Sequence, residues 1–329
     1  MTTEGTAVPF LIECSSGSQP FPHPAGLASG SVSRNLPSLR SAAVAAGTLA
    51  VIAATASSSA PLLGNTAEAA APRTLHVHYA PAVGRAPAPS PDEAVTKALK
   101  ALPKAPGAYD VAVADLDSGD RAAYASGKGT FDTASIVKVD ILATLLLQAQ
   151  DDGGGLSAAQ QKLAAAMIRS SDNDATDALW ADIGGGSGLA EANDRLGLTG
   201  TEPGDGGTWG LTQTTAADQL VLLEAVYGDG ASPLSGDSRH YVEKLMASVV
   251  DDQRWGVSAA ADDAGSAALK NGWLPRSATG LWDVNSIGRV EHRGHTLLVA
   301  VLSDGHPSYK EGIDAVENVT TTAANALRH

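Results

Sequence analysis

A serine and a lysine lie three residues apart at the start of a long apolar segment, in Ser135-Ile136-Val137-Lys138. No other lysine of the chain has a serine three positions before it. On a helix these two positions share a face, so the lysine amine could act as the base for a serine nucleophile. The same residues would also fit an ordinary helix start, with Ser135 helping to cap it and Lys138 reaching solvent.

The segment 133–147 predicts a largely buried helix, capped by Asp132 or Thr133. Ser135 would then lie in the first turn. Backbone N–H groups have no partner within the helix there, and the helix dipole is positive. An anion that forms next to Ser135 would therefore be stabilised.

Two further polar motifs follow downstream. Ser171-Asp172-Asn173 falls in a polar break between the helical patterns 163–169 and 175–183, so it presents a hydroxyl and a carboxamide on a loop. Lys270-Asn271-Gly272-Trp273 ends a short apolar run, 267–269, that leads into two hairpin-like strands. A lysine followed by glycine at a sheet edge offers a cation and a backbone that can be approached closely.

In this order the three motifs resemble those of the penicillin-recognising serine hydrolases, and the segment 167–185 looks most like the class A β-lactamases. The resemblance extends over about residues 90–325. It includes a strand at 109–116, followed by the turn Asp117-Ser118-Gly119-Asp120, ahead of the Ser135 helix. The three motifs together are far more specific than any one of them.

The resemblance implies that Ser135 is the acylated nucleophile and that Lys138 is its base or proton relay. A buried ammonium near a second cation, Lys270, should lose its proton more easily, so Lys138 could accept the Ser135 proton. Ser171 would act as a proton shuttle towards the leaving nitrogen of the substrate.

The resemblance also implies that Asn173 and the 270–273 segment bind substrate. Asn173 would donate its amide to the acylamino carbonyl, and Lys270 would attract the substrate carboxylate. Backbone N–H groups of Ser135 and Trp273 would form the oxyanion hole. The acyl donor would pair as an added strand along 270–273, where Gly272 leaves the backbone accessible.

The chain departs from the class A pattern in three places. Glu202-Pro203 matches the start of the loop whose Glu holds the deacylating water, so Glu202 is a candidate catalytic residue, although a solvated loop carboxylate is the ordinary interpretation. A competing register, with Asp194-Arg195-Leu196 as the lead-in, puts Gly197 at the Glu position. Asn271 replaces the usual Thr or Ser, which removes a hydroxyl for the substrate carboxylate. The short interval between Lys138 and Ser171 predicts a more open site and an altered substrate range.

Strand patterns near both ends, with helical patterns between, predict an α+β fold with one antiparallel sheet and a helical lobe. The expected sequence of elements is a first helix at 92–101, strands at 283–291 and 296–304, and a final helix from about 311 to 327. We expect the catalytic domain to comprise residues 92–329, with its active site in the cleft between sheet and lobe.

The N-terminal part has the layout of a secretory signal. Arg34 and Arg40 precede an apolar run at 42–54 and a small-residue stretch, so residues 1–69 are expected to be leader and signal peptide, cleaved after Ala69. The run is short for a membrane span, and we expect a secreted protein, with an uncleaved membrane anchor as the alternative. Residues 70–91 are an Ala/Pro-rich linker. Cys14 is the only cysteine and lies in the leader, so no disulfide or cysteine metal site is expected.

The chain is acidic, with a formal net charge of -14. This argues against nucleic acid or an anionic membrane as partner. The pairs His76/His78 and His292/His295 do not stand in a His-x-His-x-Asp or His-Glu-x-x-His setting, so no metal and no other cofactor are expected.

These observations predict a class A-like serine β-lactamase, acting as a monomer on a small β-lactam or a cell-wall peptide and conferring antibiotic resistance. Two alternatives remain open. One is a D-Ala-D-Ala peptidase or a penicillin-binding protein that deacylates slowly, and the other is a non-catalytic cell-wall binding protein.

Overall fold

The computed structural model describes residues 89–327 except residues 105, 128 and 264. The predicted leader, the signal peptide with its cleavage site, Cys14 and most of the 70–91 linker lie outside the described residues. In the part that is described, no helix is long and apolar enough to cross a membrane.

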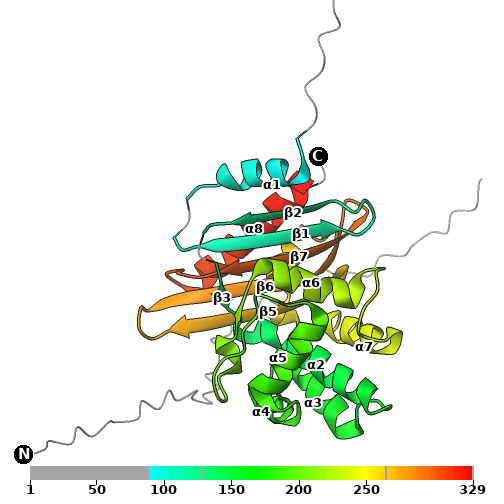
Figure 1. Ribbon diagram of the computed structural model, residues 1–329. Coiled ribbons are helices and arrows are strands. Elements are labelled where there is room, and N and C mark those ends of the chain that lie inside the picture. Colours follow the sequence, from blue (N-terminus) through cyan, green and yellow to red (C-terminus); the bar gives the residue numbers. More distant parts are fainter. Residues whose placement is uncertain (1–88, 105, 128, 264, 328–329) are drawn as a thin grey trace, which may run out of the picture. The chain divides into compact units, whose positions relative to one another are not determined.

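Five antiparallel strands form the central sheet, in the order β2-β1-β7-β6-β5 (Figure 1). They are β1 (Tyr109–Asp115), β2 (Arg121–Ala125), β5 (Ala267–Arg276), β6 (Leu281–His292) and β7 (His295–Ser303). The early strand β1 pairs along its whole length with the late strand β7. The predicted α+β fold, with a sheet built from both ends of the domain, is therefore confirmed.

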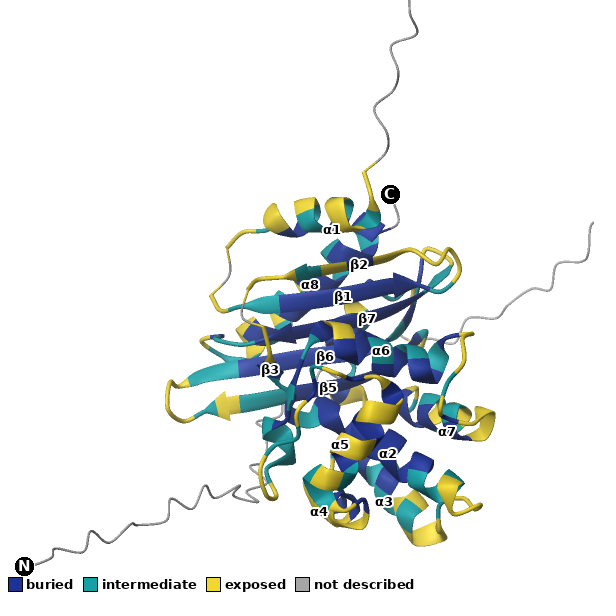
Figure 2. Cartoon of the chain, in the orientation of Figure 1, coloured by how far each residue is buried: buried dark blue, intermediate teal, exposed yellow. Residues whose placement is uncertain are grey.

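Helices cover both faces of the sheet because its central strands are apolar on both faces. Every residue of β7 from Leu297 to Leu302 is buried, as is typical of a strand between two layers. On one face, α8 (Tyr309–Leu327) packs against β1, β6 and β7, and α1 (Pro91–Lys100) packs on α8 and β2. On the other face, α6 (Ala216–Tyr227) lies against the sheet and joins it to the helical lobe (Figure 2).

The helical lobe is built around α2 (Val137–Asp151), whose residues from Val137 to Leu147 are all buried. Its neighbours in the lobe are α3 (Ala158–Arg169), α4 (Asn173–Asp182), α5 (Gly185–Leu196) and α7 (Gly236–Met246).

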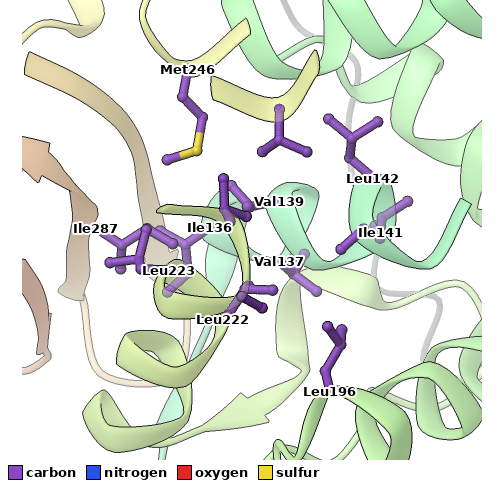
Figure 3. Packing of buried hydrophobic residues seen from close by; sticks show 14 of the residues in the cluster. Ile136, Val137, Val139, Ile141, Leu142, Leu196, Leu222, Leu223, Met246 and Ile287 are labelled. Atoms are coloured by element: carbon purple, nitrogen blue, oxygen red, sulfur yellow. The ribbon is translucent and has the colours of Figure 1, made fainter. Parts of the chain in front are cut away.

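Figure 3 shows how α2 is held. Side chains of α2 and of the turn before it lie among residues of α5, α6, α7 and β6. Truncating one such buried aliphatic side chain to alanine costs about 2–5 kcal/mol, so the start of α2 is firmly fixed. The labelled residues are Ile136, Val137, Val139, Ile141, Leu142, Leu196, Leu222, Leu223, Met246 and Ile287.

Short elements connect the lobe to the sheet. β3 (Phe131–Asp132) pairs with β4 (Gln213–Thr214), and these two strands carry the single turns η1 (Ala134–Ile136) and η2 (Trp209–Leu211) side by side. Two further turns, η3 (Asp251–Gln253) and η4 (Gly256–Ala260), precede β5.

The helix predicted from residue 133 begins differently. Residues 134–136 form the 3₁₀ turn η1, and α2 starts only at Val137. Neither predicted cap is used: the Thr133 side chain makes no capping hydrogen bond, and Asp132 binds Arg276 and Gln213 instead. Ala134 has a left-handed backbone, with φ of 46°, which interrupts a regular helix start.

The Lys270–Trp273 motif lies inside a strand and not at the end of a short run. β5 continues through Pro275 to Arg276. Because β5 is the edge strand of the sheet, the missing N–H of Pro275 can be tolerated there. The elements predicted at 92–101, 283–291, 296–304 and 311–327 correspond to α1, β6, β7 and α8 with small shifts at their ends.

Candidate active site

Ser135 lies in η1, where the edge strand β5 comes unusually close. A Cβ atom added to Gly272 would lie 2.7 Å from the Thr133 carbonyl oxygen and 2.8 Å from the Ser135 backbone nitrogen. Only glycine leaves room for this approach. The backbone of β5, which carries the third motif, therefore lies directly against the backbone of the first motif. The Ser135 side chain stays partly exposed and makes no hydrogen bond to any described residue.

Asn285 holds the approach to Ser135 in place. Its side-chain nitrogen donates to the carbonyl oxygens of Asp132, at 2.9 Å, and Thr133, at 3.1 Å. Its side-chain oxygen accepts a bond of 3.0 Å from the Ser303 backbone N–H. The sequence analysis missed this residue, because Asn285 stands among other polar residues of β6, such as Asp283 and Ser286, and nothing local marks it out.

Ser171 joins the two lysines. Its Oγ lies 3.1 Å from the Lys138 Nζ and 3.0 Å from the Lys270 Nζ. Lys138 also donates to the Ser171 carbonyl oxygen, at 2.7 Å. Ser171 has a left-handed backbone with φ of 57°, a conformation that costs a non-glycine residue about 1–3 kcal/mol and often marks a functional site. Three segments distant in the sequence therefore meet at one hydroxyl.

Both lysines are fully buried, and this lowers their pKa values. Burial lowers the pKa of Lys138 to about 7, against an opposing effect of the Asp172 and Asp177 carboxylates. Burial and the nearby Lys138 charge lower the pKa of Lys270 well below its usual range. A considerable fraction of Lys138 is then a neutral amine near neutral pH, able to accept a proton.

Asn173 lies at the first position of α4 and not on the loop before it. Its side-chain oxygen accepts a bond of 2.8 Å from the Lys138 Nζ, which leaves the amide N–H₂ group to face elsewhere. Asp172 caps the helix by accepting from the Ala175 backbone N–H at 2.7 Å. The Ser171–Asn173 motif is thus positioned by the start of α4.

Asn271 and Trp273 point to the other face of β5, as alternation along a strand requires. The buried Asn271 amide donates to the carbonyl oxygens of Gln253 and Trp255, and its oxygen accepts from Ser286. The Trp273 ring lies 5.4 Å from the Tyr309 ring. The structure therefore does not bring either side chain to the lysine cluster, and only their backbone borders it.

Glu202 is not part of the cluster. Its backbone forms an isolated bridge to Gln213, and its side chain is exposed. Within the described chain, this side chain makes no hydrogen bond to Ser135, Lys138 or Ser171. Gly197, the position favoured by the competing register, ends α5 with φ of 81°. Neither register therefore supplies a carboxylate beside the lysines.

Trp209, which sequence reasoning missed, lies over Lys138 instead. The Lys138 Nζ is 4.8 Å from the centre of the Trp209 ring, and the indole N–H donates to Asp177 at 2.8 Å. The short segment between Lys138 and Ser171 therefore does not leave the lysine open to solvent, and the more open substrate site expected from it stays a prediction. The sequence carries no signal for this contact, because η2 has no regular pattern.

The histidines of the described segments lie in structural settings. The His292 Nδ1 is 2.7 Å from the Ala260 carbonyl oxygen. His295 lies 3.1 Å from Asp115 and 3.9 Å from Asp117, and these three side chains are close enough to share a metal ion. However, the carboxylates of Asp115 and Asp117 already accept backbone N–H groups of this turn, so they have a structural role without an ion.

Comparison with known proteins supports the fold described above. The model of the beta-lactamase enzyme family matches residues 155–327, which contain the second and third motifs. "Putative lipoprotein LppW" of Mycobacterium tuberculosis is 30% identical over 158 residues, covering 46% of this chain and 50% of that protein. The chain thus spans about half the length of the curated relatives it matches.

Solved structures share the fold. A class A beta-lactamase from Bacteroides cellulosilyticus superimposes with a TM-score of 0.61 at 15% identity, covering 73% of this chain and 99% of that chain. A protein named PBP-A superimposes with a TM-score of 0.58 at 20% identity, covering 71% of this chain and 94% of that chain. At these identities the likeness concerns the fold alone.

Proposed function

Since the chain belongs to the beta-lactamase enzyme family, we propose that it is a serine β-lactamase that is acylated on Ser135 and then freed by water. In the acylation step the Ser135 Oγ bonds to the lactam carbonyl carbon, and its proton passes to the neutral Lys138 amine. The carbon–nitrogen bond then breaks, and the leaving nitrogen takes a proton through Ser171.

One observation carries this proposal: a single hydroxyl, on Ser171, lies within hydrogen-bond distance of both buried lysines. A proton on Lys138 can move through that hydroxyl towards a leaving group. The lowered pKa of Lys138, about 7, suits a group that must accept a proton and return it near neutral pH.

The remaining motif residues are proposed to bind substrate. The Asn173 amide N–H₂ would donate to a substrate carbonyl, since its oxygen is held by Lys138. Lys270, when protonated, would attract a carboxylate. Backbone N–H groups of Ser135 and Trp273 would stabilise the oxyanion, which the close approach of Gly272 to η1 supports. A side-chain contribution from Asn271 would require it to leave its present partners.

A second candidate is a D-Ala-D-Ala peptidase or a penicillin-binding protein that deacylates slowly. It is favoured by the exposed position of Glu202, because rapid hydrolysis of the ester needs a group that holds and activates a water molecule. Acylation would proceed alike in both cases, and only the second step would differ in rate.

The mass of the intact protein, followed while a chromogenic cephalosporin or a fluorescent penicillin is hydrolysed, tests this proposal. An adduct that forms and clears as substrate disappears supports a β-lactamase, and one that persists supports the second candidate. Ser135→Ala should abolish the adduct, and continued turnover in that variant would contradict the proposal. Glu202→Gln should accumulate acyl-enzyme only if Glu202 activates the water.

We also propose that the protein is exported and acts as a monomer on a small β-lactam or a cell-wall peptide. The signal-like segment before Ala69 and the name of the mycobacterial relative, which describes a lipoprotein, support export or attachment to a membrane. Fast turnover would make β-lactam resistance the biological outcome. Cell fractionation with and without residues 1–69 tests the export.

A further inference from the structure

Trp209 lies directly over the Lys138 amine. Its ring faces the amine at 4.8 Å, and the amine is fully buried although Ser135, Ser171 and Trp209 itself are partly exposed. The indole thus separates the amine from solvent with an apolar surface. A water molecule placed there would find few hydrogen-bond partners.

The ring is held in this place from two directions. Its N–H donates to the Asp177 carboxylate of α4, at 2.8 Å. The turn η2 that carries it is tied to the strand before Ser135, because the Thr133 backbone N–H donates to the Thr212 carbonyl oxygen at 2.8 Å. Any reorientation of Trp209 must therefore break the contact with Asp177 or move the turn next to the nucleophile.

The charged and titratable groups around Lys138 come from each element packed against it. Lys270 lies on β5, Asp172 precedes α4, and Asp177 lies within α4. Of the two carboxylates, Asp172 is engaged as the helix cap and Asp177 holds the indole. In the described chain, both carboxylates near Lys138 therefore already accept a structural hydrogen bond.

We propose that Trp209 is a cover that keeps water away from Lys138 and thereby sets the lifetime of the acyl-enzyme. The inference rests on the proposed acylation of Ser135 and concerns the later hydrolysis of the acyl-enzyme. Deacylation consumes one water molecule: its oxygen bonds to the acyl carbon, the bond from that carbon to the Ser135 Oγ breaks, and a proton returns to Oγ. With the cover in place this step is slower than without it, and Trp209 acts as a positioning residue that touches neither substrate nor ester.

The test compares Trp209→Ala, which removes the cover, with Trp209→Phe, which keeps a ring but loses the bond to Asp177. Trp282→Phe, on the opposite face of the sheet, is the matched control. Each protein is acylated with a penicillin, freed of excess reagent and followed by intact mass. We expect the Trp209→Ala adduct to disappear at least about tenfold faster than the parent adduct, the Trp209→Phe adduct to show an intermediate rate, and the control to match the parent.

A pair of Asp177 variants separates holding the indole from charge. Asp177→Asn keeps an acceptor for the indole N–H but loses the negative charge, whereas Asp177→Ala loses both. Faster deacylation in Asp177→Ala alone is the result expected of a cover held by this hydrogen bond. Equal acceleration in both variants would mean that charge, and not the cover, controls the step.

A second measurement does not depend on acylation. Lysine amines are labelled with acetic anhydride at a series of pH values, and the label on Lys138 is quantified by mass mapping. At pH values above the pKa of both proteins, Trp209→Ala should label faster than the parent because the amine is accessible, and its labelling should titrate at higher pH because a hydrated amine regains its proton affinity. Removing a merely structural tryptophan would not move this titration.

The outcomes distinguish the cover from the proposed function. Unchanged Lys138 labelling in Trp209→Ala would overturn the cover, and so would faster labelling with an unchanged deacylation rate. If neither the parent nor any variant forms an adduct with a β-lactam, the proposed function is wrong. The control of acyl-enzyme lifetime by Trp209 is then wrong as well. Faster labelling of Lys138 in Trp209→Ala would in that case show only that Trp209 shields the amine from solvent.

Discussion

The two faces of β5 differ sharply in how their polar groups are satisfied. On the face towards the helical lobe, Lys270 is buried beside a second lysine, and its pKa is well below its usual range because of burial and that neighbouring charge. On the opposite face, the amide of Asn271 uses both its donor and its acceptor in short hydrogen bonds. The lysine whose pKa is perturbed, and which could take part in a reaction, lies on one face of β5. The hydrogen-bonded groups on the other face stabilise the strand.

Aromatic side chains strengthen the stabilising face. The ring of Trp273 lies 6.1 Å from that of Trp255 and 5.4 Å from that of Tyr309. Trp282 lies 5.7 Å from Tyr309. Such contacts contribute about 0.5–1.5 kcal/mol per pair beyond the burial of area. The face of β5 that carries Asn271 and Trp273 can therefore hold the strand in position while its other face carries Lys270 beside Lys138.

Gly272→Val is expected to have the largest effect on acylation, because it adds a branched side chain to the face of β5 that lies towards the helical lobe. A Cβ there would lie within 2.9 Å of two backbone atoms of η1 and of the Thr133 carbonyl oxygen just before it, so β5 and Ser135 must separate. Acylation should fall by about 1000-fold or more, as expected when the oxyanion donors and the nucleophile lose alignment. Stopped-flow acylation measures the loss, and circular dichroism checks that the fold remains. Acylation within tenfold of the parent would mean that the close approach is dispensable.

Acidification should have the next largest effect on acylation. Lys138 must be neutral to accept the Ser135 proton, and its pKa is lowered to about 7. Below that pH the amine is mainly an ammonium, so the acylation rate constant should fall about tenfold per pH unit, whereas above it the rate should level off. A pH profile of acylation measures this limb. A rate that stays flat down to pH 5 would exclude Lys138 as the base.

Asn271→Ala should affect acylation least and stability most. The substitution leaves the buried carbonyl oxygens of Gln253 and Trp255 without their donor and Ser286 without its acceptor. The free energy of unfolding should fall by at least about 3 kcal/mol, since three buried groups lose a partner and each unpaired buried group costs about 1–3 kcal/mol. Chemical denaturation measures the loss. Acylation by the folded variant should stay within about twofold of the parent, and a large loss would assign the face of β5 that carries Asn271 a role in the reaction.

Much of this arrangement could be predicted from the sequence. Alternating and apolar patterns predicted the strands at both ends of the domain, whereas the common helix face expected for Ser135 and Lys138 stays a prediction, since Ser135 lies in the turn before α2. The prediction that the three motifs meet in one site rested on their order, which is that of a known family. Contacts between segments distant in the sequence leave no local sequence pattern.

The rest depends on tertiary contacts. Neither the 3₁₀ turn at Ser135 nor the ring of Trp209 over Lys138 follows from local propensity. Both arise because β5 and η2 press against the same short segment. The outward direction of Asn271 follows from strand alternation only once the motif is known to lie within β5.

The pairing of β1 with β7 has a consequence for how the protein acquires its activity. Asp110 lies opposite Leu302, so the two partners are separated by most of the domain. Contacts of such sequence separation form slowly and only after both segments have been synthesised. Asn285 also ties the segment before Ser135 to Ser303 of the last strand. During synthesis Ser135 and both lysines therefore exist before they are assembled, and the proposed site is completed only as the final strand docks.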